Sequence, residues 1–255
     1  MSHPTFRAVV LSLLLLVGLA ASATAQEATP VTDSVIVYPP DALVADASLG
    51  EWYARSLRWA VSFPADEQPS LEDTNGSRCG YGQSAPVFFL PVFFSLEAQG
   101  AVTCIVPAGL SLLVTVMGFN CTMDQPAAPD EEVLRGCAEE MADQITDVSL
   151  AVNGQEVTDI EQYRVTTPVF TISLPKDNVF NAPAGVVASM ASGYNVMLAP
   201  LPEGEYEIIP AWTVADGEET GPSQITIRVI VQGPQVLAPE ATPGAGTPEV
   251  ATPTA

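Results

Sequence analysis

The sequence predicts a mostly β protein, an immunoglobulin-like or related β-sandwich with two short helices at about residues 48–63 and 130–146. Many short runs of β-branched and aromatic residues are separated by Pro and Gly, which is typical of sandwiches. Residues 153–154 are Asn-Gly between two such runs, a dipeptide that suits the type I′ turn of a β-hairpin. Apolar residues recur with a helical period in the two helical segments.

The first helix is predicted from its beginning, its apolar stripe and its end. Ser48 and Glu51 match the S-x-x-E capping box, in which each side chain accepts a hydrogen bond from a free backbone N–H. Pro64 ends the helical pattern. The stripe at helical spacing consists of Trp52, Ser56, Trp59, Ala60 and Phe63.

The second helix is predicted from residues that repeat every four positions. This row consists of Val133, Cys137, Met141 and Ile145. Acidic residues occupy much of the rest of the segment. We therefore expect the row to face the core, with Cys137 directed inward.

The remaining β-branched and aromatic runs are predicted strands. They cover residues 34–38, 87–96, 101–106, 110–117, 147–152, 155–160, 163–174, 194–198, 205–214 and 224–231. Pro168 and Pro210 each remove one backbone donor, so we expect their strands to lie at a sheet edge or to be bulged there.

Three regions follow one another along the chain. Residues 1–25 are a predicted signal peptide, because Arg7 precedes an apolar run and small residues at 23–25 suit a signal peptidase; the alternative is an uncleaved anchor. Residues 31–237 form a predicted single β-sandwich domain, long enough to bury a core. Residues 238–255, rich in Pro, Thr and Ala, form a predicted disordered tail.

The charge is strongly negative and bears on the partners. The chain has 30 acidic and eight basic residues, and removal of residues 1–25 with Arg7 leaves seven basic residues and a net charge of −23. This charge repels phosphate backbones and anionic lipid, so we expect no nucleic-acid partner. The sequence assigns no cofactor. No second long apolar segment follows, so we expect no membrane insertion of the mature chain and a secreted or cell-envelope location.

The numbers of histidines and cysteines limit which catalytic and metal-binding sites the mature chain can form. The lone histidine, His3, lies in the predicted signal peptide, which leaves the mature chain without a histidine base or metal ligand. An even number of cysteines in an exported chain predicts disulfides. Three pairings are possible, and the order along the chain favours Cys79 with Cys104 and Cys121 with Cys137. A four-cysteine metal site is the alternative, although the spacing lacks C-x-x-C.

Several motifs between residues 52 and 231 are shared with other proteins. They comprise Trp52, Trp59, Cys79-Gly80-Tyr81-Gly82-Gln83, Cys104-Ile105-Val106-Pro107-Ala108-Gly109, Tyr163-Arg164-Val165 and the stretches 171–178 and 193–198. On these motifs the chain resembles a group of uncharacterised exported bacterial β-rich proteins. Ala85 and Phe88 stand where members of the group have glycine and tryptophan. The resemblance implies export, one disulfide and a β-rich fold, and it implies no reaction because the group has no known activity.

Carboxylates are the catalytic groups that the mature chain has in quantity. Glycoside cleavage uses two of them, one as acid and one as nucleophile or base. Glu51 is the catalytic candidate, because Trp52 and Tyr53 beside it offer ring faces for a sugar. Its capping role and the buried stripe weigh against catalysis, so no catalytic residue is assigned.

Two other candidate sites are weighed against structural explanations. Asp130, Glu139 and Asp143 are metal candidates, because calcium binds several carboxylate oxygens. The calcium-loop spacing is missing, and acids near a helix start stabilise the helix without an ion, so no metal is assigned.

The segment after Cys79 is the candidate binding loop. Its contact residues are Tyr81, Gln83 and Ser84, which a bridge at Cys79 would hold rigid. The alternative is a glycine-rich strand entry that serves packing alone.

The sequence thus predicts an exported, non-catalytic binding or structural protein of the cell envelope or extracellular space. Its ligand is unknown, and carbohydrate or another envelope protein is the expected kind of partner. The alternatives are a carboxylate-dependent polysaccharide hydrolase or lyase and a calcium-stabilised interaction module.

Overall fold

A computed structural model of the protein describes residues 35–68, 76–94, 98–124, 126–215 and 222–233. The predicted signal peptide, residues 1–25, and the predicted tail, residues 238–255, lie outside this part of the chain. None of the helices within the described ranges is long and apolar enough to cross a membrane.

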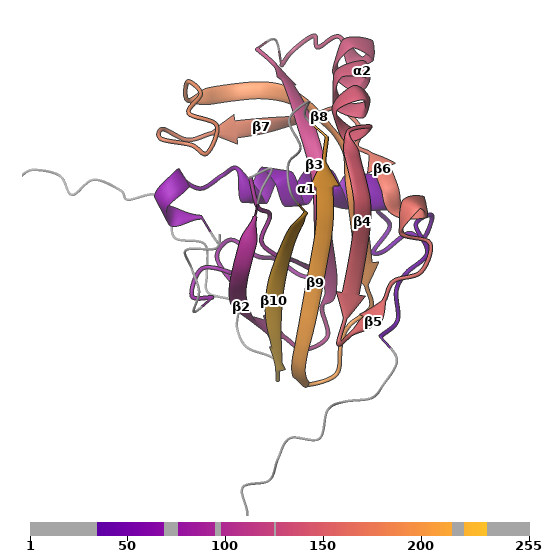
Figure 1. Ribbon diagram of the computed structural model, residues 1–255. Helices are drawn as coiled ribbons and strands as arrows, with labels where there is room; N and C mark the ends of the chain where they lie inside the picture. Colours follow the sequence, from indigo (N-terminus) through magenta and orange to yellow (C-terminus); the bar gives the residue numbers. More distant parts are fainter. Residues whose placement is uncertain (1–34, 69–75, 95–97, 125, 216–221, 234–255) are drawn as a thin grey trace, which may run out of the picture. The chain divides into compact units, whose positions relative to one another are not determined.

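The described residues form two five-stranded sheets and two α-helices (Figure 1). The first sheet contains β1 (Val87–Phe89), β3 (Ser111–Met123), β8 (Gly185–Leu198), β6 (Arg164–Thr166) and β7 (Phe170–Leu174). The second sheet contains, in spatial order, β2 (Gln99–Pro107), β10 (Ser223–Gln232), β9 (Gly204–Val214), β4 (Ile145–Val152) and β5 (Gln155–Glu156). The helices are α1 (Leu49–Ala60) and α2 (Glu131–Ala142), with short 3₁₀ helices η1 (Ala65–Glu67) and η2 (Ile160–Tyr163). The predicted fold class, a mostly β sandwich with two helices, is confirmed.

Strand direction adds a feature that the sequence did not predict. β1 runs parallel to β3, and β2 runs parallel to β10, whereas the other paired strands are antiparallel. β3 and β8 are the central pair of the first sheet, and β6 and β7 pair with successive stretches of β8 on its other side.

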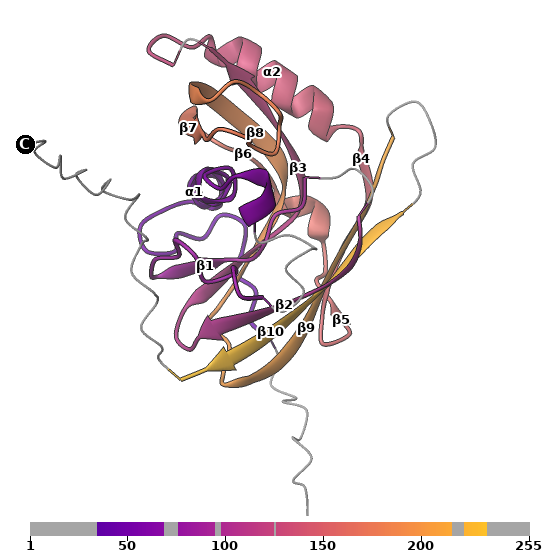
Figure 2. The same cartoon turned by 90° about the vertical axis from the view of Figure 1, so that its left-hand side faces the viewer.

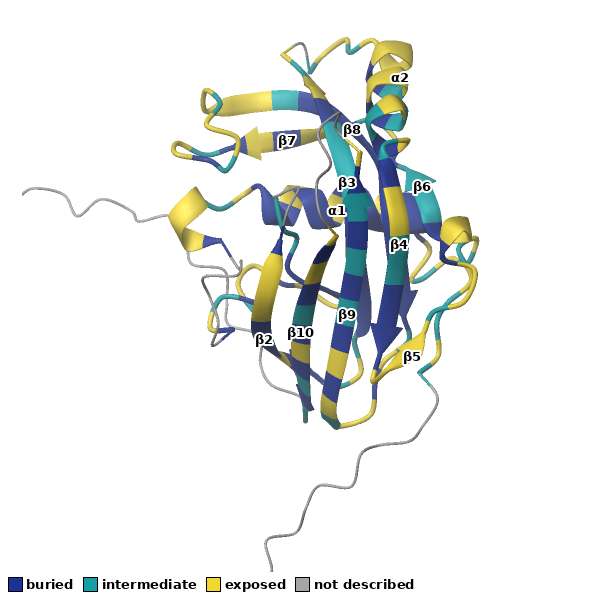
Figure 3. Cartoon of the chain, viewed as in Figure 1, coloured by how far each residue is buried: buried dark blue, intermediate teal, exposed yellow. Residues whose placement is uncertain are grey.

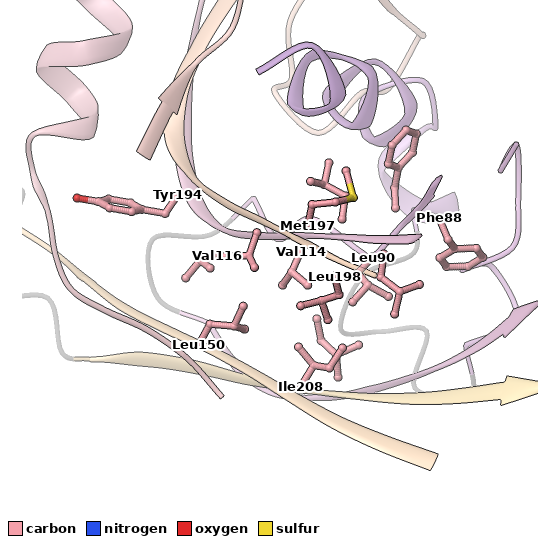
Figure 4. Close-up of a cluster of buried hydrophobic side chains, with 14 of the residues drawn as sticks. Phe88, Leu90, Val114, Val116, Leu150, Tyr194, Met197, Leu198 and Ile208 are labelled. Carbon is pink, nitrogen blue, oxygen red and sulfur yellow. The ribbon is translucent and has the colours of Figure 1, made fainter. Parts of the chain in front are cut away.

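Apolar side chains from the facing sides of the two sheets fill the core between them (Figure 4). Val114, Val196 and Leu198 of the first sheet are buried in one cluster with Leu150 and Ile208 of the second. Burial alternates along β9 and β10, as expected for a sheet with one face on a core (Figure 3).

Helix α1 covers the face of the first sheet that points away from the second sheet (Figure 2). The predicted capping box of Ser48 and Glu51 is present, and Trp52 and Trp59 are buried as expected. The helix ends at Ala60, three residues before the predicted end. It also buries a second row that includes Tyr53, Ala54 and Leu57, packed on β7 and β8.

Helix α2 corrects one prediction. The expected inward row is wrong within the helix, since Val133 is 57% exposed and Cys137 is exposed as well. Ile145 is buried, but it belongs to β4, because α2 ends at Ala142 rather than at residue 146. The buried row lies one residue further on, at Leu134, Ala138 and Ala142. Small alanine side chains let the helix approach β3 and β8 closely, and this contact decides its rotation.

The strand predictions hold best where the signals are local. The Asn153-Gly154 hairpin is confirmed, with φ of 50° and 75° at these residues, joining β4 to β5. The predicted strand at 163–174 is divided around Pro168 into β6 and β7. Pro210, however, lies in the interior strand β9, so the edge position is wrong; of the two expected alternatives the bulge fits better, because the β4–β9 register shifts close to Pro210, between Thr146 and Ser149. The ladder between β9 and β10 instead omits Pro210.

Other strand boundaries differ from the prediction. Residues 87–96 form a strand at 87–89 within the described part, and residues 34–38 contribute one bridge, Val37 to Leu198. β3 and β8 are longer than predicted.

Both predicted disulfides are present. Cys79–Cys104 joins the turn before β1 to β2, and Cys121–Cys137 joins β3 to α2. No cysteine of the described chain is free. Such bridges are typical of proteins in oxidising compartments.

Candidate binding pocket

The predicted binding loop is held from within by Gln83. Its side-chain amide donates to the carbonyl oxygens of Cys79 at 3.0 Å and Phe89 at 2.8 Å, and its side-chain oxygen accepts from Phe89 N–H at 3.1 Å. The buried Gln83 side chain is therefore committed to the loop. Tyr81, which is 50% exposed, and the exposed Ser84 remain predicted contact residues.

Glu51 is committed to the start of α1. Its carboxylate accepts hydrogen bonds from the backbone N–H and the hydroxyl of Ser48, each at 2.8 Å. These hydrogen bonds, the backbone one foremost, lower the pKa of Glu51 below its ordinary value. A general acid needs a raised pKa, so the geometry does not favour Glu51 in that role.

The three metal candidates have partners within the protein. Asp130 accepts from Val133 N–H and caps α2, and Asp143 forms an ion pair with Arg164 at 2.6 Å. Glu139 accepts from the Thr166 hydroxyl at 3.2 Å. Across the described ranges, no three His, Cys, Asp or Glu side chains gather closely enough to hold a metal ion.

A pocket of about 250 Å³ with aromatic walls lies beside the free edge of β3. β3 pairs with β1 only over Ser111–Leu113, so no described strand pairs with residues 117–120 on that side. We call this the aromatic pocket; its lining residues are Tyr53, Leu57, Val92, Phe93, Phe94, Met117, Gly118, Phe119, Asn120, Met141, Val179 and Phe180. The side chains of these described lining residues are uncharged and mostly apolar, and main-chain groups supply much of the polar part of the wall.

The loop between β7 and β8 supplies one wall of the aromatic pocket. Asn178, which is 1% exposed, donates to the carbonyl oxygens of Pro175 and Ala182 and accepts from the backbone N–H groups of Phe180 and Ala182. These four hydrogen bonds fix the loop from inside. Val179 and Phe180 are thereby presented to the pocket on a rigid support.

Phe180 forms the rim of the aromatic pocket. Its ring meets Phe94 edge to face, with centroids 5.5 Å apart and planes at 89°. Phe180 is nevertheless 37% exposed, so a large aromatic surface remains open beside the pocket. Exposed aromatic rings at a concave site are typical of binding surfaces.

A second hollow, of about 460 Å³, lies on the second sheet and contains carboxylates. Glu205 and Glu207 are exposed there on one face of β9, about 7 Å apart along the strand, with Arg228 on the neighbouring strand. Tyr206 lies between them but is buried, and its hydroxyl donates to the Pro202 carbonyl. Tyr206 is therefore turned toward the core and offers no stacking surface for a sugar.

The sequence does not predict the aromatic pocket, because the residues that line it come from five separate segments of the chain. Each aromatic residue by itself has the pattern of a core residue. The one available signal was Val179-Phe180, an apolar pair between turn-forming polar residues and outside any predicted strand. An aromatic residue in such a loop indicates a surface role.

Comparison with known proteins does not assign the chain to a family. No family model matches the chain, and no curated protein matches it. Among solved structures, the chain is similar to PbICP-C, from its complex with falcipain-2, at 13% identity over 58% of this chain and 100% of that one, with a TM-score of 0.25. It is also similar to amebosin in solution, at 10% identity over 53% and 98% of the two chains, with a TM-score of 0.19. At these TM-scores neither likeness bears on function.

Proposed function

We propose that the protein is an exported, non-catalytic binding protein whose ligand is a small, uncharged aromatic compound held in the aromatic pocket. Export is supported by the predicted signal peptide, by the resemblance to exported bacterial proteins and by the two disulfides. The observation that carries the ligand class is the uncharged, aromatic lining of the pocket.

The size of the aromatic pocket favours a single ring. An apolar cavity of about 150 Å³ holds benzene, so about 250 Å³ accommodates one substituted ring. A sugar of similar size would bring many hydroxyl groups, whereas among the described lining residues only Tyr53 and Asn120 have polar side chains, beside the main-chain groups of the β3 edge. Unpaired sugar hydroxyls in such a pocket are unfavourable. The pocket therefore suits an aromatic ligand better than the carbohydrate expected from the sequence.

Removal of the rim should weaken ligand binding. We expect acetophenone to bind the wild-type protein with a Kd of about 0.1–1 mM, as suits a ligand of this size. Phe180→Ala should raise this Kd by about tenfold, because the pocket loses the Phe180 ring as part of its wall and the Phe180–Phe94 contact is lost as well. Isothermal titration calorimetry or ligand-observed NMR measures the change.

The matched control removes an exposed apolar side chain elsewhere. Ile105 of β2 is 43% exposed and does not line the aromatic pocket, so Ile105→Ala should leave the Kd unchanged. Equal weakening by both substitutions would indicate nonspecific surface binding. Absence of binding by every neutral aromatic probe would refute the proposed function.

The hydrolase alternative rests on Glu205 and Glu207 in the second hollow. Because that hollow lacks an aromatic wall, we expect the purified protein to release no reducing sugar from a panel of polysaccharides. Turnover that disappears in Glu207→Gln or Glu51→Gln, with the circular dichroism spectrum unchanged, would replace the proposed function with hydrolysis.

A further inference from the structure

The hydroxyl of Tyr53 has no hydrogen-bond partner among the described residues. Tyr53 is 1% exposed, yet none of the hydrogen bonds within the described chain involves its phenolic oxygen. Buried tyrosine hydroxyls usually find a partner. Tyr163 illustrates the rule, since its hydroxyl donates to the Tyr38 carbonyl at 3.2 Å. Among the described residues, Ser189 Oγ and Asn195 Nδ2 are the fully enclosed polar side-chain atoms without a partner, so the Tyr53 oxygen is not sealed off and a small molecule can reach it.

Two glycines place this hydroxyl at the wall of the aromatic pocket. Gly118 of β3 lies directly opposite Gly193 of β8, so the two strands approach closely here, and the absence of a side chain at Gly118 leaves a notch in the first sheet. A Cβ added to Gly118 would lie 2.3 Å from the Tyr53 oxygen, so the hydroxyl occupies this notch. Since Gly118 and Tyr53 both line the aromatic pocket, the hydroxyl is a polar group at its wall.

The Tyr53 hydroxyl is suited to donate. Burial raises the pKa of Tyr53 far above its ordinary value, so the phenol keeps its proton at any physiological pH. A ligand that brings an oxygen acceptor would satisfy this donor. A carbonyl fits better than a hydroxyl, because a carbonyl adds no donor of its own that would need a second partner in apolar surroundings.

We propose that the Tyr53 hydroxyl, unpartnered in the notch at Gly118, donates a hydrogen bond to the carbonyl oxygen of an aromatic ligand. This inference rests on the proposed function and names its ligand class as aryl carbonyl compounds. The ring of such a ligand occupies the aromatic walls, and its carbonyl points toward the first sheet.

The test compares two ligands of nearly the same shape. Acetophenone carries the carbonyl oxygen, whereas α-methylstyrene has a CH₂ group in its place. Wild-type protein should bind acetophenone about tenfold more tightly, the ratio that one net hydrogen bond provides. Tyr53→Phe should bind the two ligands equally, because this substitution removes the donor alone. Titration calorimetry of all four combinations isolates the contribution of the hydrogen bond.

A second measurement needs no ligand. Removing a hydroxyl that lacks a partner should leave the melting temperature of the free protein unchanged or raise it, so Tyr53→Phe should not be destabilised. The matched control is Tyr163→Phe, which should melt at a lower temperature because it loses the hydrogen bond to Tyr38.

The outcomes distinguish this inference from the proposed function. Binding of both ligands with equal Kd to wild-type protein would overturn the Tyr53 inference and leave the aromatic pocket as the binding site. A lower melting temperature for Tyr53→Phe would also overturn it, because the hydroxyl would then have a partner inside the protein. Failure of both ligands to bind would overturn the proposed function and the inference together.

Discussion

Gly193→Ala is expected to destabilise the protein by about 3 kcal/mol or more. A Cβ at Gly193 would lie 2.4 Å from the Gly118 Cα and 2.5 Å from the Met117 carbonyl oxygen. Both neighbours are backbone atoms, so relief of the contact requires separation of β3 from β8, the central pair of the first sheet. Urea denaturation followed by circular dichroism measures the loss as a lower midpoint with an unchanged slope.

Gly136→Ala in α2 is the matched control. An added Cβ there has no heavy atom within 4 Å, and alanine is the better helix former. We expect a gain of about 0.5–1 kcal/mol from this substitution. If Gly193→Ala left the free energy of unfolding unchanged, the close approach of β3 and β8 at this point would be incorrect.

The same pair of glycines indicates which parts of the fold could be predicted from the sequence. The capping box at Ser48 and the turn at Asn153-Gly154 depend on residues within a few positions of one another, and both were predicted. The close approach of Gly118 to Gly193 joins segments 75 residues apart, and no local pattern encodes it. The parallel pairing of β2 with β10 was unpredictable for the same reason.

The first half of β8 illustrates how packing overrides propensity. Residues 185–193 are rich in Gly, Ala and Ser, which are poor strand formers, so the sequence predicts no strand there. Met190 packs with α2 and Ala191 with α1, so neighbouring residues place the two helices on opposite faces of this strand. Small side chains allow both helices to come close. Close packing of a helix on each face therefore explains why this strand contains small residues of low strand propensity.

The error at α2 and the missed pocket have a common physical origin. Rows such as Val133–Cys137–Met141 and Leu134–Ala138–Ala142 have the same spacing and differ by one residue's rotation of the helix. The surface of β3 and β8 selects between them, and hydrophobicity alone favoured the wrong row. The aromatic pocket likewise depends on how five segments meet, so its residues could be recognised only after the fold was known.

Removal of the Cys79–Cys104 disulfide is the second change expected to have a large effect. This bridge closes a 25-residue separation and limits the unfolded chain, which stabilises the fold by about 3–4 kcal/mol. Both cysteines are completely buried, so the double variant Cys79→Ala/Cys104→Ala also loses packing. The free energy of unfolding from urea titration should fall by at least that amount.

The Cys121–Cys137 bridge provides the comparison within the same chain. Its separation is 16 residues, which corresponds to about 3 kcal/mol, and its loss should cost less because Cys137 is exposed.

The exposure of Cys137 also predicts the order in which the two disulfides are reduced under native conditions. A mild reductant followed by alkylation and peptide mass spectrometry should label Cys121 and Cys137 before Cys79 and Cys104, since attack on a disulfide requires access to sulfur. Simultaneous labelling of all four cysteines would contradict this order and would mean that both disulfides are reduced only when the whole protein unfolds. A peptide linked through Cys104 and Cys121 would refute the pairing itself.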